Sequence, residues 1–347
     1  MSLQAQGVAF LAQAVAFLNC LKPVSIDTTL KRGIYQLRRP TPRPERMTMA
    51  LEIKLLSLID IDIESSFLVL GRNMGVRTRI PTFGFLILGG EEPILVDTGA
   101  SHAEIMQRLG MTGYVTEEME LEHQLAKYDL APSDVRWVLH THLHIDHAGQ
   151  DATFPVSTTV VINRRELEYS VSGLMGEQYP AEYIKHLIDR LHTPGALRLL
   201  DLELSGPEEI IPGVWCEAAG GHTEGSMNVL VETKQGRACI CGDVIYDIQN
   251  QIVEPLYQIL EHEPQPTGNH ATTKREEKAA VKKALQNAFV LPVHDYPARL
   301  EAGRVVARLS DAVPGPEEPV EMKLPSQTGA IIGMDFLPHD VLVPSGV

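Results

Sequence analysis

Short runs of aliphatic side chains begin near Ala50 and recur along the chain to about residue 310. Glycine, proline and aspartate bound most of these runs, and runs of this length are typical of buried β-strands. The segments predicted as strands are EIKLLSL, SSFLVLG, FGFLILGG, EPILVDTG, VRWVLH, TTVVI, VWCEAAGGHT, MNVLVET, ACICGD and FVLPVHD.

Apolar residues at helical spacing separate several of these strands. Thr273 and Glu276 stand three residues apart, as in a capping box, and predict a helix that runs to about Ala288. Strands that alternate with helices in two similar halves favour a layered α/β protein. Further helices are predicted in the segment NRRELEYS and at Glu117–Tyr128, Ala181–Leu191 and Ala298–Leu309.

The two ends of the chain differ in composition from this patterned region. Residues 1–49 are basic and proline-rich, and we expect a poorly ordered extension there. A start site placed too far upstream and a targeting peptide are alternatives, since arginine-rich, acid-poor segments can direct transport. Residues 50–310 form the predicted folded domain, and residues 311–347 form a tail rich in proline and glycine.

Charge and hydrophobicity exclude several kinds of partner. The 347 residues carry a net charge of −15, whereas binding to nucleic acid needs a clustered basic surface. No segment has the ~20 unbroken apolar residues of a membrane span. The most apolar stretch, Gly7–Leu21, contains Gln13 and Asn19 and lacks the features of a signal peptide. We therefore expect a cytoplasmic protein with no nucleic-acid partner and no membrane span.

The four cysteines are too few for a disulfide framework in a chain of this length. Cys239 and Cys241 lie two residues apart in an apolar run, so on a strand both side chains would point to one face of the sheet. We therefore expect both to be small core residues rather than a metal or redox pair.

Four histidines and an aspartate crowd into eight residues at the end of the predicted strand VRWVLH. Neutral imidazole is a common metal ligand, and carboxylates complete many such sites. In an extended segment His142 and His144 point the same way and can reach one ion. A turn after them would direct Asp146 and His147 towards a second ion. His140 has the same parity as His142, but we expect it to be structural.

Three more polar residues stand where predicted strands end. His222 lies in a glycine-rich turn, Asp243 follows Cys-Gly, and His294 stands between valine and aspartate. Each is a weak signal alone, because strand ends often carry such residues in loops. Their order after the histidine cluster makes all three candidate ligands. Asp97, in the strand-end motif Leu-Val-Asp-Thr-Gly, precedes the cluster.

In this order, these elements resemble the metallo-β-lactamase superfamily from about Ile53 to His294. The resemblance implies an αββα sandwich of two mixed β-sheets flanked by helices, with two divalent metal ions at one edge. Zinc is the expected metal, although iron, manganese or cobalt also suit histidine and aspartate. The resemblance implies that the first metal is bound by His142, His144 and His222. It implies that the second metal is bound by Asp146, His147 and His294, and that Asp243 bridges the two metals. Asp97 would orient one of the ligands through a hydrogen bond without binding a metal itself.

One motif narrows the subfamily that the chain resembles. Common two-zinc β-lactamases have cysteine at the position of Asp243. An aspartate at this position is similar to the bridging aspartate of glyoxalase II, the homoserine lactonases and a nuclease branch of the superfamily. The acidic charge argues against the nucleases. The lactonases have a tyrosine three residues after the bridging aspartate, as in Asp243-Val-Ile-Tyr246, and it binds the substrate carbonyl. Glu224 departs from the family, which has proline at this position of the glycine–histidine turn.

The resemblance therefore implies a hydrolase that opens N-acyl homoserine lactones, or a similar lactone, by attack of a metal-bridging hydroxide. Tyr246 would stabilise the oxyanion, and Asp146 would carry a proton to the leaving alkoxide. We expect an apolar wall for the acyl chain around Met175, Tyr179 and Tyr183. The alternatives are a glyoxalase II-like thioester hydrolase, a mono-iron persulfide dioxygenase and a binding module that kept the scaffold. The sequence leaves open whether the chain forms a homodimer.

Overall fold

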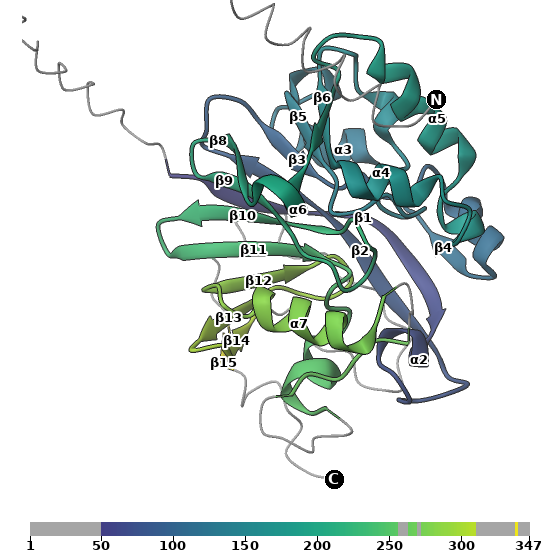
Figure 1. Cartoon of the computed structure of the whole chain (residues 1–347), viewed down its shortest axis with the longest axis vertical. Helices are drawn as coiled ribbons and strands as arrows, with labels where there is room; N and C mark the ends of the chain where they lie inside the picture. Colours follow the sequence, from purple (N-terminus) through teal and green to yellow (C-terminus); the bar gives the residue numbers. More distant parts are fainter. Residues whose placement is uncertain (1–49, 256–262, 269–271, 310–336, 339–347) are drawn as a thin grey trace, which may run out of the picture. The chain divides into compact units, whose positions relative to one another are not determined.

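The computed structural model describes residues 50–255, 263–268, 272–309 and 337–338. In this part of the chain, two mixed β-sheets pack face to face and helices cover their outer faces (Figure 1). The predicted αββα sandwich is confirmed.

The first sheet combines an antiparallel half with a parallel half. Its strands are β1 (Glu52–Glu64), β2 (Arg77–Leu88), β3 (Ile94–Val96), β4 (Thr112–Tyr114), β5 (Trp137–Leu139), β6 (Thr159–Asn163) and β7 (Leu197–Leu200). They lie in the order β4-β1-β2-β3-β5-β6-β7. The pairs from β4 to β3 are antiparallel, and the pairs from β3 to β7 are parallel.

The second sheet is antiparallel except at one pair of strands. Its strands are β8 (Glu208–Ile211), β9 (Val214–Ala218), β10 (Met227–Thr233), β11 (Gly236–Gly242), β12 (Phe289–Pro292), β13 (Ala298–Glu301), β14 (Arg304–Arg308) and β15 (Leu337–Pro338). They follow one another in space in chain order, and β11 and β12 form the parallel pair. The strand ends after β9, β11 and β12 therefore lie at the same edge of this sheet.

The helices are short and connect the strands. The α-helices are α2 (Ser65–Leu68), α3 (Leu121–Ala126), α4 (Arg164–Ser170), α5 (Ala181–Leu191), α6 (Leu202–Ser205) and α7 (Lys274–Ala284). There is a 3₁₀-helix of seven residues, η1 (Ala103–Leu109). Single 3₁₀ turns are η2 (Glu117–Met119), η3 (Pro132–Asp134), η4 (Asp151–Thr153) and η5 (Gly176–Gln178), and η6 (Gln249–Val253) is a π-helix.

Alternation along the strands distributes the hydrophobic side chains between three cores. On β2, Phe83 and Phe85 enter the core between the two sheets, whereas Leu86 enters the core beneath α5. The third core lies between the second sheet and α7, which runs along that sheet's outer face in Figure 1. Cys239 and Cys241 are both buried in this third core, which confirms the prediction that they are core residues.

Two predictions of secondary structure are wrong, and a third predicted segment forms two short helices instead of one. The predicted helix at Ala298–Leu309 is the hairpin of β13 and β14, because Ala302 and Gly303 adopt positive φ angles of 50° and 77° and turn the chain. The segment SSFLVLG is not a strand but begins with α2, which the Glu64 carboxylate caps by accepting from the Ser66 N–H. The predicted helix at Glu117–Tyr128 is interrupted at residue 120, which has an extended backbone.

Several predictions concern parts or properties that the described residues do not test. The N-terminal extension at 1–49 lies outside the described residues, as does the tail at 311–347 apart from β15. Predictions for these ends, for the compartment and for a homodimer stay predictions. Among the described residues, no helix combines the length and the apolar character that crossing a bilayer requires.

The core between the sheets gives a stability prediction. Phe85 is fully buried, so Phe85→Ala should lower the free energy of unfolding by about 3–5 kcal/mol through lost burial and a residual cavity. Leu204 is 88% exposed, and Leu204→Ala should change the free energy of unfolding by less than about 0.5 kcal/mol. Urea unfolding followed by circular dichroism measures both, and equal losses would contradict this description of the core.

Candidate metal centre

Seven polar side chains meet where strands of both sheets end. Four of them come from the loop after β5, and the others follow β9, β11 and β12. None has more than 8% of its surface exposed. The structure thus brings together all the residues that the sequence predicted as metal ligands: His142, His144, Asp146, His147, His222, Asp243 and His294.

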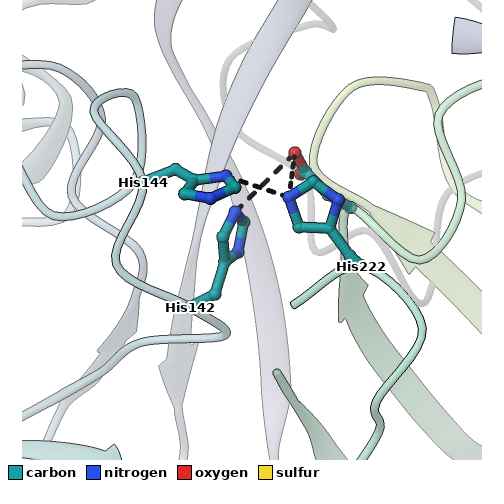
Figure 2. Close-up of side chains that lie close together, drawn as sticks. His142, His144 and His222 are labelled. Carbon is teal, nitrogen blue, oxygen red and sulfur yellow. Dashed lines mark hydrogen bonds and ion pairs between the residues drawn. The ribbon is translucent and has the colours of Figure 1, made fainter. Parts of the chain in front are cut away.

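The first group consists of His142, His144, His222 and Asp243, whose ligand atoms lie within 4.8 Å of one another. The rings of the three histidines converge in Figure 2. His222 Nε2 lies 3.0 Å from His144 Nδ1 and 3.5 Å from Asp243 Oδ2. His142 Nε2 lies 3.8 Å from the same carboxylate oxygen. These four side chains could enclose one small cation.

The second group consists of Asp146, His147 and His294, and it shares the Asp243 carboxylate with the first. Asp243 Oδ1 lies 3.1 Å from His147 Nε2 and 3.2 Å from His294 Nε2. Asp146 Oδ2 lies 3.4 Å from His294 Nε2. One oxygen of Asp243 therefore faces each group, which is the arrangement that a carboxylate bridging two cations requires.

Buried atoms without partners support a metal in each group. His142 Nε2, His147 Nε2 and Asp243 Oδ1 have no hydrogen-bond partner among the described residues. Buried polar atoms are normally hydrogen-bonded, and leaving one unsatisfied costs about 1–3 kcal/mol. Imidazole nitrogen and carboxylate oxygen are both ligands of divalent transition metals. The donor set therefore fits a pair of divalent cations.

The electrostatics of the first group favour metal ligation. Burial lowers the pKa of His222 to about 4. Burial and the neighbouring imidazoles hold the pKa values of His142 and His144 well below their usual range. Burial acts to raise the pKa of Asp243, but the surrounding histidines hold it well below its ordinary value. Neutral rings therefore present lone pairs beside an ionised carboxylate.

Asp97, directly after β3, supports the histidine loop from behind. Its Oδ2 accepts from His147 Nδ1 at 3.0 Å, and its Oδ1 accepts from the Thr141 N–H at 2.9 Å. Its backbone has a φ of 58°, a conformation that non-glycine residues rarely adopt. Hydrogen bonds of this kind fix the tautomer and orientation of a ligand ring. His140 lies outside both groups, 2.9 Å from the Asp151 carboxylate, in a supporting position.

Sequence reasoning missed a second supporting carboxylate, Glu166 at the start of α4. It is fully buried and binds the backbone of the histidine loop and the side chain of Thr223. The available signal was its place in the segment NRRELEYS, where a carboxylate stands directly before the buried Leu167. That signal is weak, because most glutamates at such positions are solvated.

Tyr246 lies at the centre, as its spacing from Asp243 led us to expect. Its hydroxyl donates to Asp243 Oδ2 at 2.6 Å. Its ring stacks on His294, with ring centroids 5.1 Å apart and an interplanar angle of 4°. Tyr246 therefore contacts both the shared carboxylate and the second group.

Met175, Tyr179 and Tyr183, the predicted acyl wall, are not among the residues that line the pocket beside the metal centre, and their role in binding substrate stays a prediction. The Tyr179 hydroxyl donates to Glu166, and the Tyr183 hydroxyl donates to Ser101, so both tyrosines support the scaffold. Met175 packs partly buried against the core beneath α5. The pocket beside the centre is lined instead by side chains of β1, β2 and η1 and the residues near them, among them Ile61, Ile63, Phe67, Ile80, Met106, Leu109 and Met111.

The fold and the paired histidine and aspartate groups define a metal-dependent hydrolase. The chain belongs to the metallo-beta-lactamase superfamily, whose profile matches residues 77–298.

Known relatives and solved structures agree with this family. An N-acyl homoserine lactonase of Bacillus cereus is 30% identical over 187 residues, which cover 51% of this chain and 68% of the relative. A Bacillus thuringiensis AiiA mutant with bound N-decanoyl-L-homoserine has a TM-score of 0.52 at 19% identity, covering 69% and 88% of the two chains. The dizinc lactonase AidC has a TM-score of 0.53 at 16% identity, covering 76% and 96%.

Metal analysis tests the two groups separately. We expect about two zinc ions per chain after loading and dialysis. His222→Ala and His294→Ala should each lower the count by about one, because each removes a ligand from a different group. The exposed His123 serves as a control, since His123→Ala should leave the count unchanged. Two ions retained in both ligand variants would contradict the assignment.

Proposed function

We propose that this chain hydrolyses the lactone ring of N-acyl homoserine lactones or of a similar lactone with an apolar substituent. The observation that carries the proposal is the composition of the pocket, which joins aliphatic side chains to polar atoms of the metal centre. Relatives named N-acyl homoserine lactonase, at 29% and 30% identity, support the same substrate class.

The two sides of the pocket suit the two parts of such a substrate. Burying an alkyl chain against aliphatic walls gains about 0.8 kcal/mol per CH₂ group, while an ester carbonyl needs polar partners. Among the described residues, no lysine or arginine lines the pocket, so the carboxylates of a glutathione thioester would find no cationic partner there. On the polar side the pocket presents His144, Asp146, Gln178, Asp243, Tyr246 and His294.

The reaction adds water to the lactone carbonyl carbon and breaks the ring C–O bond. Two divalent cations in the centre, which we expect to be zinc, would activate water and polarise the carbonyl. Asp146 borders the pocket. In this proposal it would take a proton from the water and pass it to the leaving alkoxide oxygen. Tyr246 would donate its hydroxyl hydrogen to the carbonyl oxygen as negative charge develops there.

A substrate panel tests the proposal directly. Zinc-loaded protein should release acid from homoserine lactones in a pH-stat, and the rate should depend on the length of the acyl chain. The same assay with acyl thioesters tests the glyoxalase II alternative, and an oxygen electrode tests the dioxygenase. Hydrolysis of thioesters without hydrolysis of any lactone would overturn the proposed function.

The role of Tyr246 can be separated from metal binding. Tyr246→Phe should lower kcat on a lactone by about 10²–10³-fold, the usual loss when one oxyanion donor is removed. The ring and its stacking on His294 remain, so the zinc content should not change. Steady-state kinetics and metal analysis of the same sample measure both. An unchanged kcat would remove Tyr246 from the mechanism.

The walls of the pocket should set the preference for chain length. Leu109 lines the pocket, so Leu109→Trp should lower kcat/KM for long acyl chains more than for short ones by occupying volume. Leu191 on α5 is 45% exposed and does not line the pocket, and Leu191→Trp should leave the ratio unchanged. The ratio of kcat/KM for a long and a short lactone is the measurement, and the same shift in both variants would argue against this wall.

A further inference from the structure

A single buried carboxylate connects the two chain segments that carry the histidines of the first group. We propose that Glu166 is a positioning residue that holds His142, His144 and His222 in register and thereby sets the affinity of the first group for its cation. The inference rests on the metal centre of the proposed hydrolase and concerns metal binding rather than substrate.

Glu166 contacts the neighbours of all three histidines. Its Oε1 accepts from the Leu143 N–H at 2.9 Å, and Leu143 stands between His142 and His144. Its Oε2 accepts from the Thr223 hydroxyl at 2.6 Å, and Thr223 directly follows His222. A movement of this carboxylate would therefore shift both segments relative to each other.

Tyr179 adds a third link between Glu166 and the first group. Its hydroxyl donates to Glu166 Oε1 at 2.8 Å, and its ring meets the ring of His144 edge-on at a centroid distance of 4.8 Å. Hydrogen bonds from three separate donors fix the carboxylate in one orientation. The tyrosine in turn fixes the plane of a ring that offers its Nδ1 to the first group.

The His222 turn packs closely against the helix that carries Glu166, and a hydrogen bond holds it there. A Cβ atom added at Gly225 would come 2.0 Å from the Glu166 backbone nitrogen, so the turn lies directly against the start of α4. Asn163 Nδ2 also donates to the Gly225 carbonyl at 3.0 Å. The turn and the helix therefore act as one unit, with Glu166 inside it.

Glu166 forms no ion pair with a lysine or arginine among the described residues, and the only histidine that acts on its charge is His147. Glu166 is fully buried, and its hydrogen-bond donors are a backbone N–H and two hydroxyls. A buried carboxylate that lacks a lysine or arginine partner is stabilised by a metal cation nearby, because the low dielectric strengthens their attraction. A metal ion in the first group is the cation that this position would favour.

The second group has a different set of supports. His147 is oriented by Asp97, and His294 Nδ1 donates to the Pro81 carbonyl at 2.8 Å. Glu166 makes no hydrogen bond to the residues of that group. The effect of Glu166 should therefore be selective for the first group, and selectivity distinguishes positioning from a general loss of stability.

The test measures zinc affinity in two backgrounds of the full chain. His294→Ala leaves the first group intact, and His222→Ala leaves the second. Adding Glu166→Gln should weaken zinc binding about 10–100-fold in the His294→Ala background, the usual cost of losing an outer hydrogen-bond partner. In the His222→Ala background the change should stay within about twofold. Competition with a chromophoric chelator gives both affinities.

Glutamine is the informative replacement because it keeps the size of the side chain. Its single carbonyl oxygen can face the fixed Leu143 N–H, which leaves the NH₂ group opposite the Thr223 hydroxyl, where an acceptor stood. Thr223→Val removes one of the same bonds and should give a smaller loss in the same background. It tests the inference independently if Glu166→Gln does not fold.

Asp60→Asn is the matched control for removing a buried carboxylate. Asp60 on β1 is 2% exposed and pairs with Arg79 at 2.7 Å, so its replacement should leave zinc affinity unchanged in both backgrounds. Equal losses from Glu166→Gln in the two backgrounds, or no loss in either, would overturn the inference. Binding of zinc without hydrolysis of any lactone would overturn the proposed function and leave this inference intact.

Discussion

The shared carboxylate of Asp243 imposes the constraint on which the rest of the structure depends. Its two oxygens face different groups of ring nitrogens, at 3.1 Å from His147 and 3.5 Å from His222. His147 belongs to a loop of the first sheet, whereas Asp243 and His222 follow strands of the second. The centre therefore forms only if the two sheets pack in one register, and the apolar core between them supplies that register. Hydrophobic packing thus positions polar groups whose burial would otherwise be unfavourable.

Backbone anchoring carries this constraint from the sheets to the ligand atoms. The histidine loop has no regular structure, so its conformation depends on side chains that bind its N–H groups. Asp97 binds Thr141 and Glu166 binds Leu143, which fixes the loop on both sides of His142. Each carboxylate also reaches a second element of the centre. The supporting shell is therefore as much a part of the centre as the ligands, and it explains why such short loops hold buried imidazoles in place.

Local signals in the sequence predicted the ligands better than they predicted their surroundings. The spacing of His142 and His144 in an extended segment is itself typical of two ligands of one metal. The family resemblance added the distant His294 to the predicted metal centre. Glu166 and the pocket walls depend on which elements pack together, and a single sequence does not encode that in a local pattern. The hairpin of β13 and β14 was missed for a related reason. Its strands are only four and five residues long, and their apolar positions also fit helical spacing.

The proposed function assigns catalysis and substrate preference to different elements of this fold. The ligand atoms come from loops after β5, β9, β11 and β12, whereas most apolar walls of the pocket come from β1, β2 and η1. A side chain such as Ile80 can therefore change the shape of the pocket without moving a ligand. For this reason the geometry of the centre identifies a metal-dependent hydrolase, whereas the walls of the pocket would decide which substrate reaches it. We therefore expect the residues that determine substrate preference to lie in β1, β2 and η1 rather than in the histidine loop.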